Sequence, residues 1–304
     1  MVLAKHILHT NLKDAQMIFT KEQVTKKTIF AHLGAHKTAT SLIQQYFKAK
    51  HKYYADQGVY FLNRSEISPF ISWGDKIIKD PTELAQGLKK KTKKSNAPTI
   101  FFSNENVLGR PLQRTPGLYP SAKDIIPALG KALSAYDTKI IYSIRPQWEF
   151  LESYYLQKVH QGYFLTFNQF LESVDMDNLY WQPVIDALGA EFGQENVKIV
   201  DFSLIRKGQD TFISEFIKQN ISEDLIPDLD YAKVHNASIS DRGLQLALRI
   251  NPLLKREETS SVRKFLQENF SNQTEPRPNL LSADMKAVLK DRYESDYNGL
   301  VTKT

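Results

Sequence analysis

Residues 34–41 carry the side chains best suited to bind a phosphate or sulfate group. The segment follows an apolar run, starts with Gly34, and supplies one ammonium and three hydroxyls from Lys37, Thr38, Thr40 and Ser41. A loop between a strand and a helix points its backbone N–H groups at one spot, and the helix dipole adds positive potential there. The segment therefore predicts an anion-binding loop.

The spacing in this loop differs from that of a Walker A loop, G-x-x-x-x-G-K-[ST]. Lys37 and Thr38 come only three and four residues after Gly34, and no second glycine precedes the lysine. This shorter loop is less suited to a triphosphate with Mg²⁺. The simpler alternative is a surface lysine in a strand-to-helix turn whose hydroxyls cap the helix.

A second pair of residues that could bind an anion is Arg145 and Ser153. Arg145 directly follows the apolar run 139–144, and Ser153 lies two turns into the helix predicted after it. The carboxyl ends of parallel strands line a common ligand crevice, so we expect Arg145 at the same edge as the first loop. A guanidinium can bind a phosphate through two hydrogen bonds. The alternative is an arginine that pairs with Glu149 or Glu152.

Alternating strand and helix signals predict the scaffold that positions these residues. Short apolar runs predict strands at residues 28–33, 59–62, 99–103, 139–144 and 197–202. Helical spacing predicts helices at about 41–47, 80–96, 124–135, 147–161 and 210–219. This order predicts an α/β fold of three layers, α/β/α, with a central parallel sheet. Residues 109–121, rich in Gly and Pro, predict a loop that could serve as an acceptor lid.

Composition limits the remaining classes. The chain has 304 residues, no cysteine and a net charge of +6, which excludes a disulfide scaffold and a cysteine nucleophile and favours an anionic ligand. No apolar run approaches the ~20 residues of a membrane helix, and the N-terminus lacks a signal-peptide core, so we expect a soluble, cytoplasmic protein. We expect a single domain over 1–304, with an N-terminal arm at 1–26 and a helical part at 235–304.

Together the two candidate motifs resemble a family, the sulfotransferases that use 3′-phosphoadenosine 5′-phosphosulfate (PAPS). Residues 34–41, Gly-Ala-His-Lys-Thr-Ala-Thr-Ser, are similar to the 5′-phosphosulfate loop of that family. Residues 144–155, which include Arg145 and Ser153, are similar to its 3′-phosphate segment. Residues 103–106 and the tail around 236–240 and 291–298 resemble bacterial, carbohydrate-type members. The resemblance runs from about residue 27 to residue 300, and Ala39 stands where many members have glycine, which should narrow the loop.

The resemblance implies a P-loop-like nucleotide-binding fold and a metal-free, in-line transfer of a sulfuryl group to a hydroxyl or amine. It implies that PAPS is the co-substrate and that adenosine 3′,5′-bisphosphate (PAP) is the product. Lys37 would stabilise the departing 5′-phosphate, which the loop would hold through Gly34, Ala35, His36, Lys37, Thr38, Ala39, Thr40 and Ser41. Arg145 and Ser153 would hold the 3′-phosphate, which distinguishes this donor from ATP.

The resemblance also implies an acceptor that is a carbohydrate or glycolipid, and a base that takes the acceptor proton. Glu105, which follows the predicted strand 99–103, is the expected base, and His36 is the second candidate. His32 is expected in the core. Asn236 and Arg242 could contact donor or acceptor. The triplet Arg206-Lys207-Gly208 is similar to a nucleotide-contacting triplet of cytosolic members, but it comes too early in the chain and is interpreted as coincidental.

The sequence leaves three other functions open. A P-loop kinase would use Asp201, at the end of the predicted strand 197–202, to hold Mg²⁺. A binder of nucleic acid or another anionic polymer would use the lysine-rich segment 89–94, although no RNA- or DNA-binding module is recognisable. A metallohydrolase is the weakest, because the seven histidines are scattered and only His6 and His9 lie close together.

Overall fold

The computed structural model describes residues 26–93, 95–233 and 238–302. Its centre is a parallel sheet with strand order β2-β3-β1-β4-β5. The strands are β1 (Thr28–His32), β2 (Val59–Leu62), β3 (Thr99–Ser103), β4 (Asp137–Ile144) and β5 (Val197–Asp201). Every strand predicted from an apolar run is present, with ends that differ by two residues or fewer. The predicted three-layer α/β/α fold with a central parallel sheet is confirmed.

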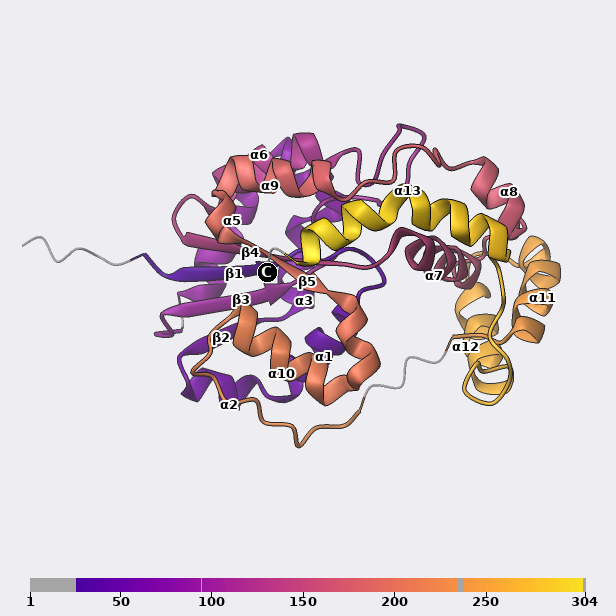
Figure 1. Cartoon of the computed structure of the whole chain (residues 1–304). Helices are drawn as coiled ribbons and strands as arrows, with labels where there is room; N and C mark the ends of the chain where they lie inside the picture. The colour runs from indigo at the N-terminus through magenta and orange to yellow at the C-terminus, as the bar shows by residue number, and fades with distance from the viewer. Residues whose placement is uncertain (1–25, 94, 234–237, 303–304) are drawn as a thin grey trace, which may run out of the picture.

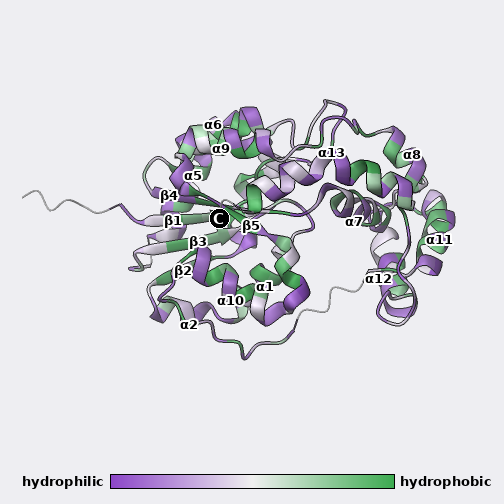
Figure 2. Ribbon diagram, viewed as in Figure 1, coloured by the Kyte–Doolittle hydropathy of each residue, from purple (hydrophilic) through white to green (hydrophobic). Residues whose placement is uncertain are grey.

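The strands alternate their side chains between two hydrophobic clusters, one on each face of the sheet. Ile29 and Ala31 of β1 pack into one cluster, while Phe30 packs against the other. The first cluster is covered by α5 (Pro81–Thr92), α6 (Ala122–Leu133) and α9 (Gln182–Phe192). The second is covered by α1 (Thr40–Ala49), α2 (His51–Asp56) and α10 (Gln209–Asn220). Figure 1 shows these two helical layers above and below the strands, and the apolar strands between them are green in Figure 2.

A group of helices lies beyond the carboxyl ends of the strands, at the right of Figure 1. It comprises α7 (Gln147–His160), α8 (Phe167–Glu172), α11 (Asp241–Ile250) and α12 (Thr259–Asn269). The last helix, α13 (Ala283–Val301), runs from this group back to β5. The predicted helical C-terminal part is therefore confirmed over its described residues, 238–302.

Shorter elements complete the chain. Two helices, α3 (Arg64–Ile67) and α4 (Asp75–Lys79), and the 3₁₀ turns η1 (Ser68–Phe70) and η2 (Ser72–Gly74) lie between β2 and α5. Further 3₁₀ turns are η3 (Gln194–Asn196), η4 (Phe202–Lys207) and η5 (Asn251–Leu253). Residues 109–121 form the predicted loop. Among the described residues, no helix combines the length and apolarity that a membrane crossing requires. The predicted arm falls outside the described residues except for Lys26.

Candidate active site

The carboxyl edge of the sheet brings together residues that are far apart in the sequence. The loop with Lys37 follows β1, Glu105 follows β3 and Arg145 follows β4. Because all strands are parallel, these three segments end at the same edge. The Arg145 guanidinium donates a hydrogen bond of 3.0 Å to the Lys37 carbonyl oxygen. The two segments singled out in the sequence are therefore in direct contact.

The loop after β1 stays hydrogen-bonded to β4 before it turns into α1. The amide of Leu33 donates to Ile141 O at 2.9 Å, and that of Ala35 donates to Ser143 O at 2.8 Å. Thr38 Oγ1 then donates back to Ala35 O, which closes the turn. Lys37 (φ 67°) and Ala39 (φ 62°) adopt the left-handed conformation. This is the region that favours glycine, so the alanine at position 39 fits the loop at an energetic cost.

The N-terminus of α1 has no side-chain cap, although hydroxyls surround it. Ala39 is the N-cap residue and offers no acceptor to the first amides of the helix. The Thr40 side chain is 5% exposed, and its Oγ1 is buried without a hydrogen-bond partner. Arg145 Nε is also buried and unpartnered. A buried donor without a partner is rare in proteins, so these two atoms fit an anionic ligand that would accept from them.

Lys37 reaches solvent and forms no ion pair among the described residues. Its pKa is lowered to about 8, first because the surrounding protein removes part of its hydration. Repulsion from Arg145 and Arg263 lowers this pKa further, whereas Glu105 opposes the shift. An anion bound beside Lys37 would relieve this repulsion.

Arg145 is held by four contacts and is mostly buried. Besides Lys37 O, the guanidinium bonds Glu149 Oε2 at 3.2 Å and lies 4.7 Å from the Phe202 ring centroid. Burial lowers the Arg145 pKa, and the Glu149 carboxylate opposes that effect. The backbone is fixed as well, since Trp181 Nε1 donates to Arg145 O at 2.9 Å.

Glu149 also pairs with Arg206 of η4, so a second arginine reaches this part of the site. From its position in the chain, Arg206-Lys207-Gly208 is not expected at the nucleotide site. Arg206 nevertheless lies beside the candidate site, because η4 follows β5 and β5 is the neighbour of β4. The strand order was the missing information. Ser153, four residues after Glu149, lies on the same face of α7 and is half-buried.

Glu105 is positioned between β3 and α1. Its side chain is 14% exposed, and its carboxylate pairs with Arg64 Nη1 at 3.2 Å. Gln44 Nε2 donates to Glu105 Oε2 at 3.3 Å and to Ser103 O at 2.9 Å. These contacts hold the carboxylate close to the loop, where its negative charge raises the pKa of Lys37.

His36 is buried and uses both ring nitrogens in hydrogen bonds. Nδ1 and the backbone amide both contact the Tyr119 hydroxyl, at 2.8 and 2.7 Å, and Nε2 lies 3.2 Å from Asn106 Oδ1. The ring stacks on Trp73 with an interplanar angle of 4°. Burial lowers the His36 pKa to about 4, so the imidazole is neutral near pH 7. These contacts indicate that His36 holds the loop in its conformation.

His32 lies in the core, as predicted. It is fully buried and bridges Ser103 Oγ (2.8 Å) and Ser143 Oγ (2.9 Å), which ties β1 to both neighbouring strands. Burial lowers its pKa to about 3. A Cβ on Gly34 would lie 2.5 Å from His32 Nε2. The glycine at position 34 is therefore required by space around the histidine.

Several residues considered for other roles have partners of their own or lie outside the described residues. Asp201, the expected Mg²⁺ ligand of a kinase, accepts hydrogen bonds from the Ser203 amide and hydroxyl and from the Tyr297 hydroxyl. Arg242 pairs with Glu275 and packs over Phe270. Within the described ranges, no three His, Asp or Glu side chains are grouped to hold a metal ion. His6, His9 and Asn236 lie outside the described residues.

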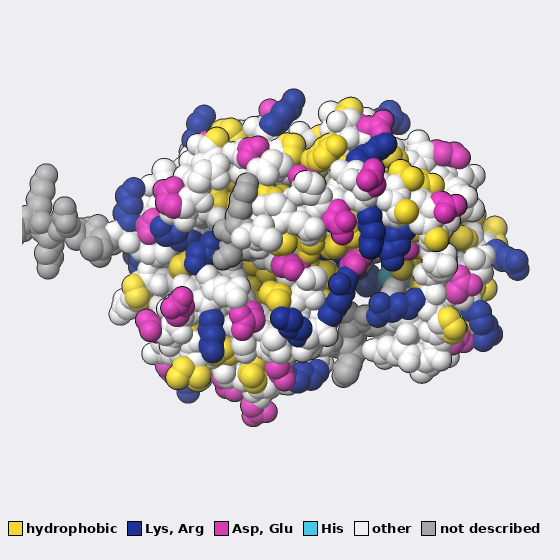
Figure 3. Space-filling model, viewed as in Figure 1, with side chains coloured by type: hydrophobic (Ala, Val, Ile, Leu, Met, Phe, Trp, Pro, Cys, Tyr) yellow, Lys and Arg dark blue, Asp and Glu magenta, His cyan; other side chains and the backbone are white. Residues whose placement is uncertain are grey.

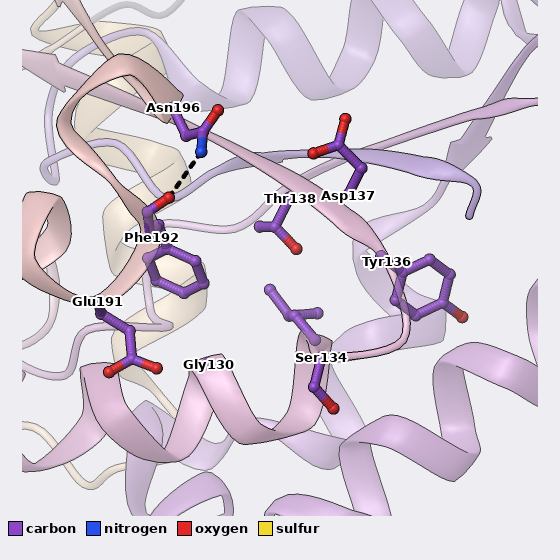
Figure 4. A pocket seen from close by; sticks show the side chains of 9 residues that line it. Gly130, Ser134, Tyr136, Asp137, Thr138, Glu191, Phe192 and Asn196 are labelled. Atoms are coloured by element: carbon purple, nitrogen blue, oxygen red, sulfur yellow. Dashed lines mark hydrogen bonds between the residues drawn. The ribbon is translucent and has the colours of Figure 1, made fainter. Parts of the chain in front are cut away.

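Hollows lie at opposite edges of the sheet in the described part of the chain. One, of about 210 Å³, lies at the amino end of β4 between α6 and α9, where Asp137 and Glu191 contribute carboxylates (Figure 4). It is at the edge opposite to Lys37 and does not belong to the site. The other, of about 400 Å³, adjoins Glu105 at the carboxyl end of β2 and is lined by polar side chains: Gln44, Gln45, Lys48, Asn63, Arg64, Ser65 and Ser68.

Comparison with known proteins gives a likeness in structure and none in sequence. No protein-family model and no curated protein matches the sequence. Among solved structures, the chain is similar to a sulfotransferase from Alicyclobacillus acidocaldarius at 15% sequence identity and a TM-score of 0.44. The similarity covers 75% of this chain and 93% of that one.

Proposed function

We propose that the chain is a sulfotransferase that uses PAPS as its sulfuryl donor. The observation that carries the proposal is the contact between the two anion-binding segments, in which Arg145 bonds the backbone of the Lys37 loop. The unpartnered Thr40 Oγ1 and Arg145 Nε support it, because a donor with phosphates at both its 5′ and 3′ positions would supply acceptors to both. The resemblance of residues 34–41 and 144–155 to the donor-binding segments of that family points the same way.

In this proposal the chain's residues hold and polarise the donor. The loop amides of residues 34–41 and the hydroxyls of Thr40 and Ser41 bind the 5′-phosphate, while Arg145 and Ser153 bind the 3′-phosphate. An acceptor oxygen forms a bond to sulfur as the bond from sulfur to the bridging phosphate oxygen breaks. Lys37 stabilises the negative charge that develops on the leaving 5′-phosphate.

Glu105 is the proposed base that accepts the acceptor proton. Its carboxylate lies at the same edge as Lys37 and is oriented by Arg64 and Gln44. His36 is less suited to this role, since both ring nitrogens are engaged and its pKa is about 4. We assign His36 to the shaping of the loop.

The acceptor would approach from the β3–β2 side, because the donor occupies the β1–β4 side. The polar hollow next to Glu105 presents amides, hydroxyls and two cationic side chains. Such groups match a polyhydroxylated acceptor, which favours a carbohydrate or the head of a glycolipid. A kinase that phosphorylates a small molecule or glycan is the alternative, although the occupied Asp201 carboxylate counts against it.

Calorimetric titration with PAP, ADP and Mg-ATP tests the proposal. We expect metal-free binding of PAP that is at least tenfold tighter than that of ADP, since only PAP places a phosphate near Arg145. Mg-ATP should bind more weakly than PAP. A preference for Mg-ATP would instead favour the kinase, and Arg145 and Ser153 would lose their proposed role.

A further inference from the structure

The C-terminal end of α7 is bonded by Asn251 of η5 and lies beside the start of α12. Asn251 Nδ2 donates to Val159 O and Tyr163 O at 2.9 Å each, which fixes the end of α7. A Cβ on Gly162 would lie 3.6 Å from Thr259, the first residue of α12. Arg263 comes one helical turn after Thr259, on the same face of α12. His160 and Arg263 are therefore carried by two helices that are docked at this point.

His160 has a buried ring nitrogen that the proposed donor contacts do not use. Its Nε2 is buried and has no hydrogen-bond partner. The His160 pKa is lowered to about 4, mainly by burial and to a lesser extent by the positive charges of Arg263 and Lys37. The imidazole thus lies within the electrostatic reach of both cations.

Arg263 also lacks an acidic partner among the described residues. Its Nε contacts Gln267 Oε1 at 3.4 Å, and none of the ion pairs in the described ranges includes this exposed side chain. Lys37 is likewise without a carboxylate partner, and Arg263 lowers its pKa. In the space-filling view, lysine and arginine side chains gather between α10 and α12, with acidic side chains nearby (Figure 3). Neighbouring cations that have no ion-pair partner of their own, as Lys37 and Arg263 are, favour the binding of an anion.

This group is separate from the proposed 3′-phosphate site. His160 lies seven residues after Ser153 on the same helix, which is a distance of about 10 Å along the axis. One phosphate cannot contact both residues. The 5′ and 3′ phosphates of the donor already have their proposed partners, so the group around His160 and Arg263 is left for another anion.

We propose that His160 and Arg263 form a subsite for an acidic group of the acceptor, such as a sulfate ester or a carboxylate, so that the enzyme acts on an anionic acceptor. The inference rests on the proposed function. Arg263 would supply a charge-assisted hydrogen bond, and His160 Nε2 would donate a second one.

The test uses the full chain saturated with PAP and titrated with sodium sulfate at constant ionic strength in a calorimeter. We expect the wild-type complex to bind one sulfate and Arg263→Gln to weaken that binding at least tenfold. PAP affinity should change less than twofold. Lys264→Gln removes the same charge from the neighbouring position of α12, where Lys264 faces Glu268, and should behave as wild type. Glucose 6-sulfate should displace the sulfate, and glucose should not.

Each other result overturns the inference. Sulfate binding that is absent from the wild-type complex, or unchanged in Arg263→Gln, would remove the subsite. A loss of PAP affinity in Arg263→Gln would assign the residue to the donor. Displacement by both sugars, or by neither, would show that an acidic acceptor group is not what is recognised. PAP binding is measured first, before any sulfate is added. If the wild-type protein binds no PAP, the proposed function itself is wrong.

Discussion

The Arg145 guanidinium and the Lys37 carbonyl oxygen, 108 positions apart in the sequence, are joined by a hydrogen bond of 3.0 Å. Arg145 Nη1 donates this bond, Nη2 donates to Glu149, and Nε has no hydrogen-bond partner. The Arg145 side chain thus holds the loop in place, and its Nε can still donate a hydrogen bond to a ligand. The loop and the end of β4 are therefore parts of a single site.

Arg145→Ala should weaken PAP binding about 30-fold or more, because it removes charge-assisted hydrogen bonds worth about 2 kcal/mol or more. Arg145→Lys should give an intermediate affinity, since an ammonium keeps the charge but cannot bond the loop and a phosphate in the same geometry. Calorimetry with PAP measures both. Arg249→Ala on α11, an exposed arginine, is the matched control and should bind as wild type. Equal affinities for all four proteins would show that Arg145 does not contact the donor.

Glu105→Gln should lower kcat about 10²–10⁴-fold, the usual contribution of a general base. PAP affinity should stay the same or rise slightly, because a negative charge near the phosphate loop is removed. Product formation with radiolabelled donor, together with calorimetry, separates the two effects. The base assignment would be wrong if Glu105→Gln retained full turnover with normal donor binding.

The pH dependence of donor binding should follow Lys37. Its pKa is lowered to about 8, so the free enzyme loses this positive charge as the pH rises through 8. A bound phosphate favours the protonated amine, and PAP affinity should therefore fall above pH 8, by up to about tenfold per pH unit. Lys37→Arg keeps its charge over this range and should show an almost flat profile. A wild-type affinity that is constant from pH 7 to 10 would contradict this account.

Gly34→Ala should destabilise the protein by about 1–3 kcal/mol, the usual range for overpacking a filled interior. The added methyl group would meet His32 Nε2 at 2.5 Å and disturb the hydrogen bond from the imidazole to Ser143. Urea denaturation at pH 7 measures the change in unfolding free energy. Wild-type stability in Gly34→Ala would mean that the histidine can move aside without loss.

Ala39→Gly should stabilise the protein by about 0.5–1 kcal/mol, because relief of the left-handed alanine outweighs the extra entropy of the unfolded chain. Ala85→Gly makes the same chemical change inside α5, where the backbone is right-handed, and should destabilise by about 0.5–1 kcal/mol. Thermal denaturation of the two variants compares them directly. Shifts of the same sign would exclude the conformational explanation.

The strands were predictable because each is a short apolar run that ends at a polar residue. The short helices α2, α3, α4 and α8 and the longer α9 were not predicted, although α8 begins with a recognisable capping box from Thr166 to Gln169. The sequence was sufficient to place Lys37 and Arg145 at the carboxyl edge of the sheet, because each comes shortly after a predicted strand. That the chain forms a single domain stays a prediction.

Contacts that depend on strand order and helix docking could not be predicted. Arg206 reaches Glu149 only because β5 neighbours β4, and the helix that carries Arg263 lies beside the end of α7 only because α12 docks there. Tyr119 lies in a loop whose composition shows no partner, yet its hydroxyl bonds His36. Each of these contacts joins segments separated by more than 50 residues.

The bond between Tyr119 and His36 has a thermodynamic consequence for the loop of residues 109–121, which we expect to serve as an acceptor lid. Tyr119 is buried and contacts both the backbone and the ring of the residue before Lys37. An acceptor that displaces this loop would also disturb the phosphate loop, so the occupancies of the two substrates would be linked. By the reciprocity of linkage, the factor by which acceptor changes donor affinity equals the factor by which donor changes acceptor affinity.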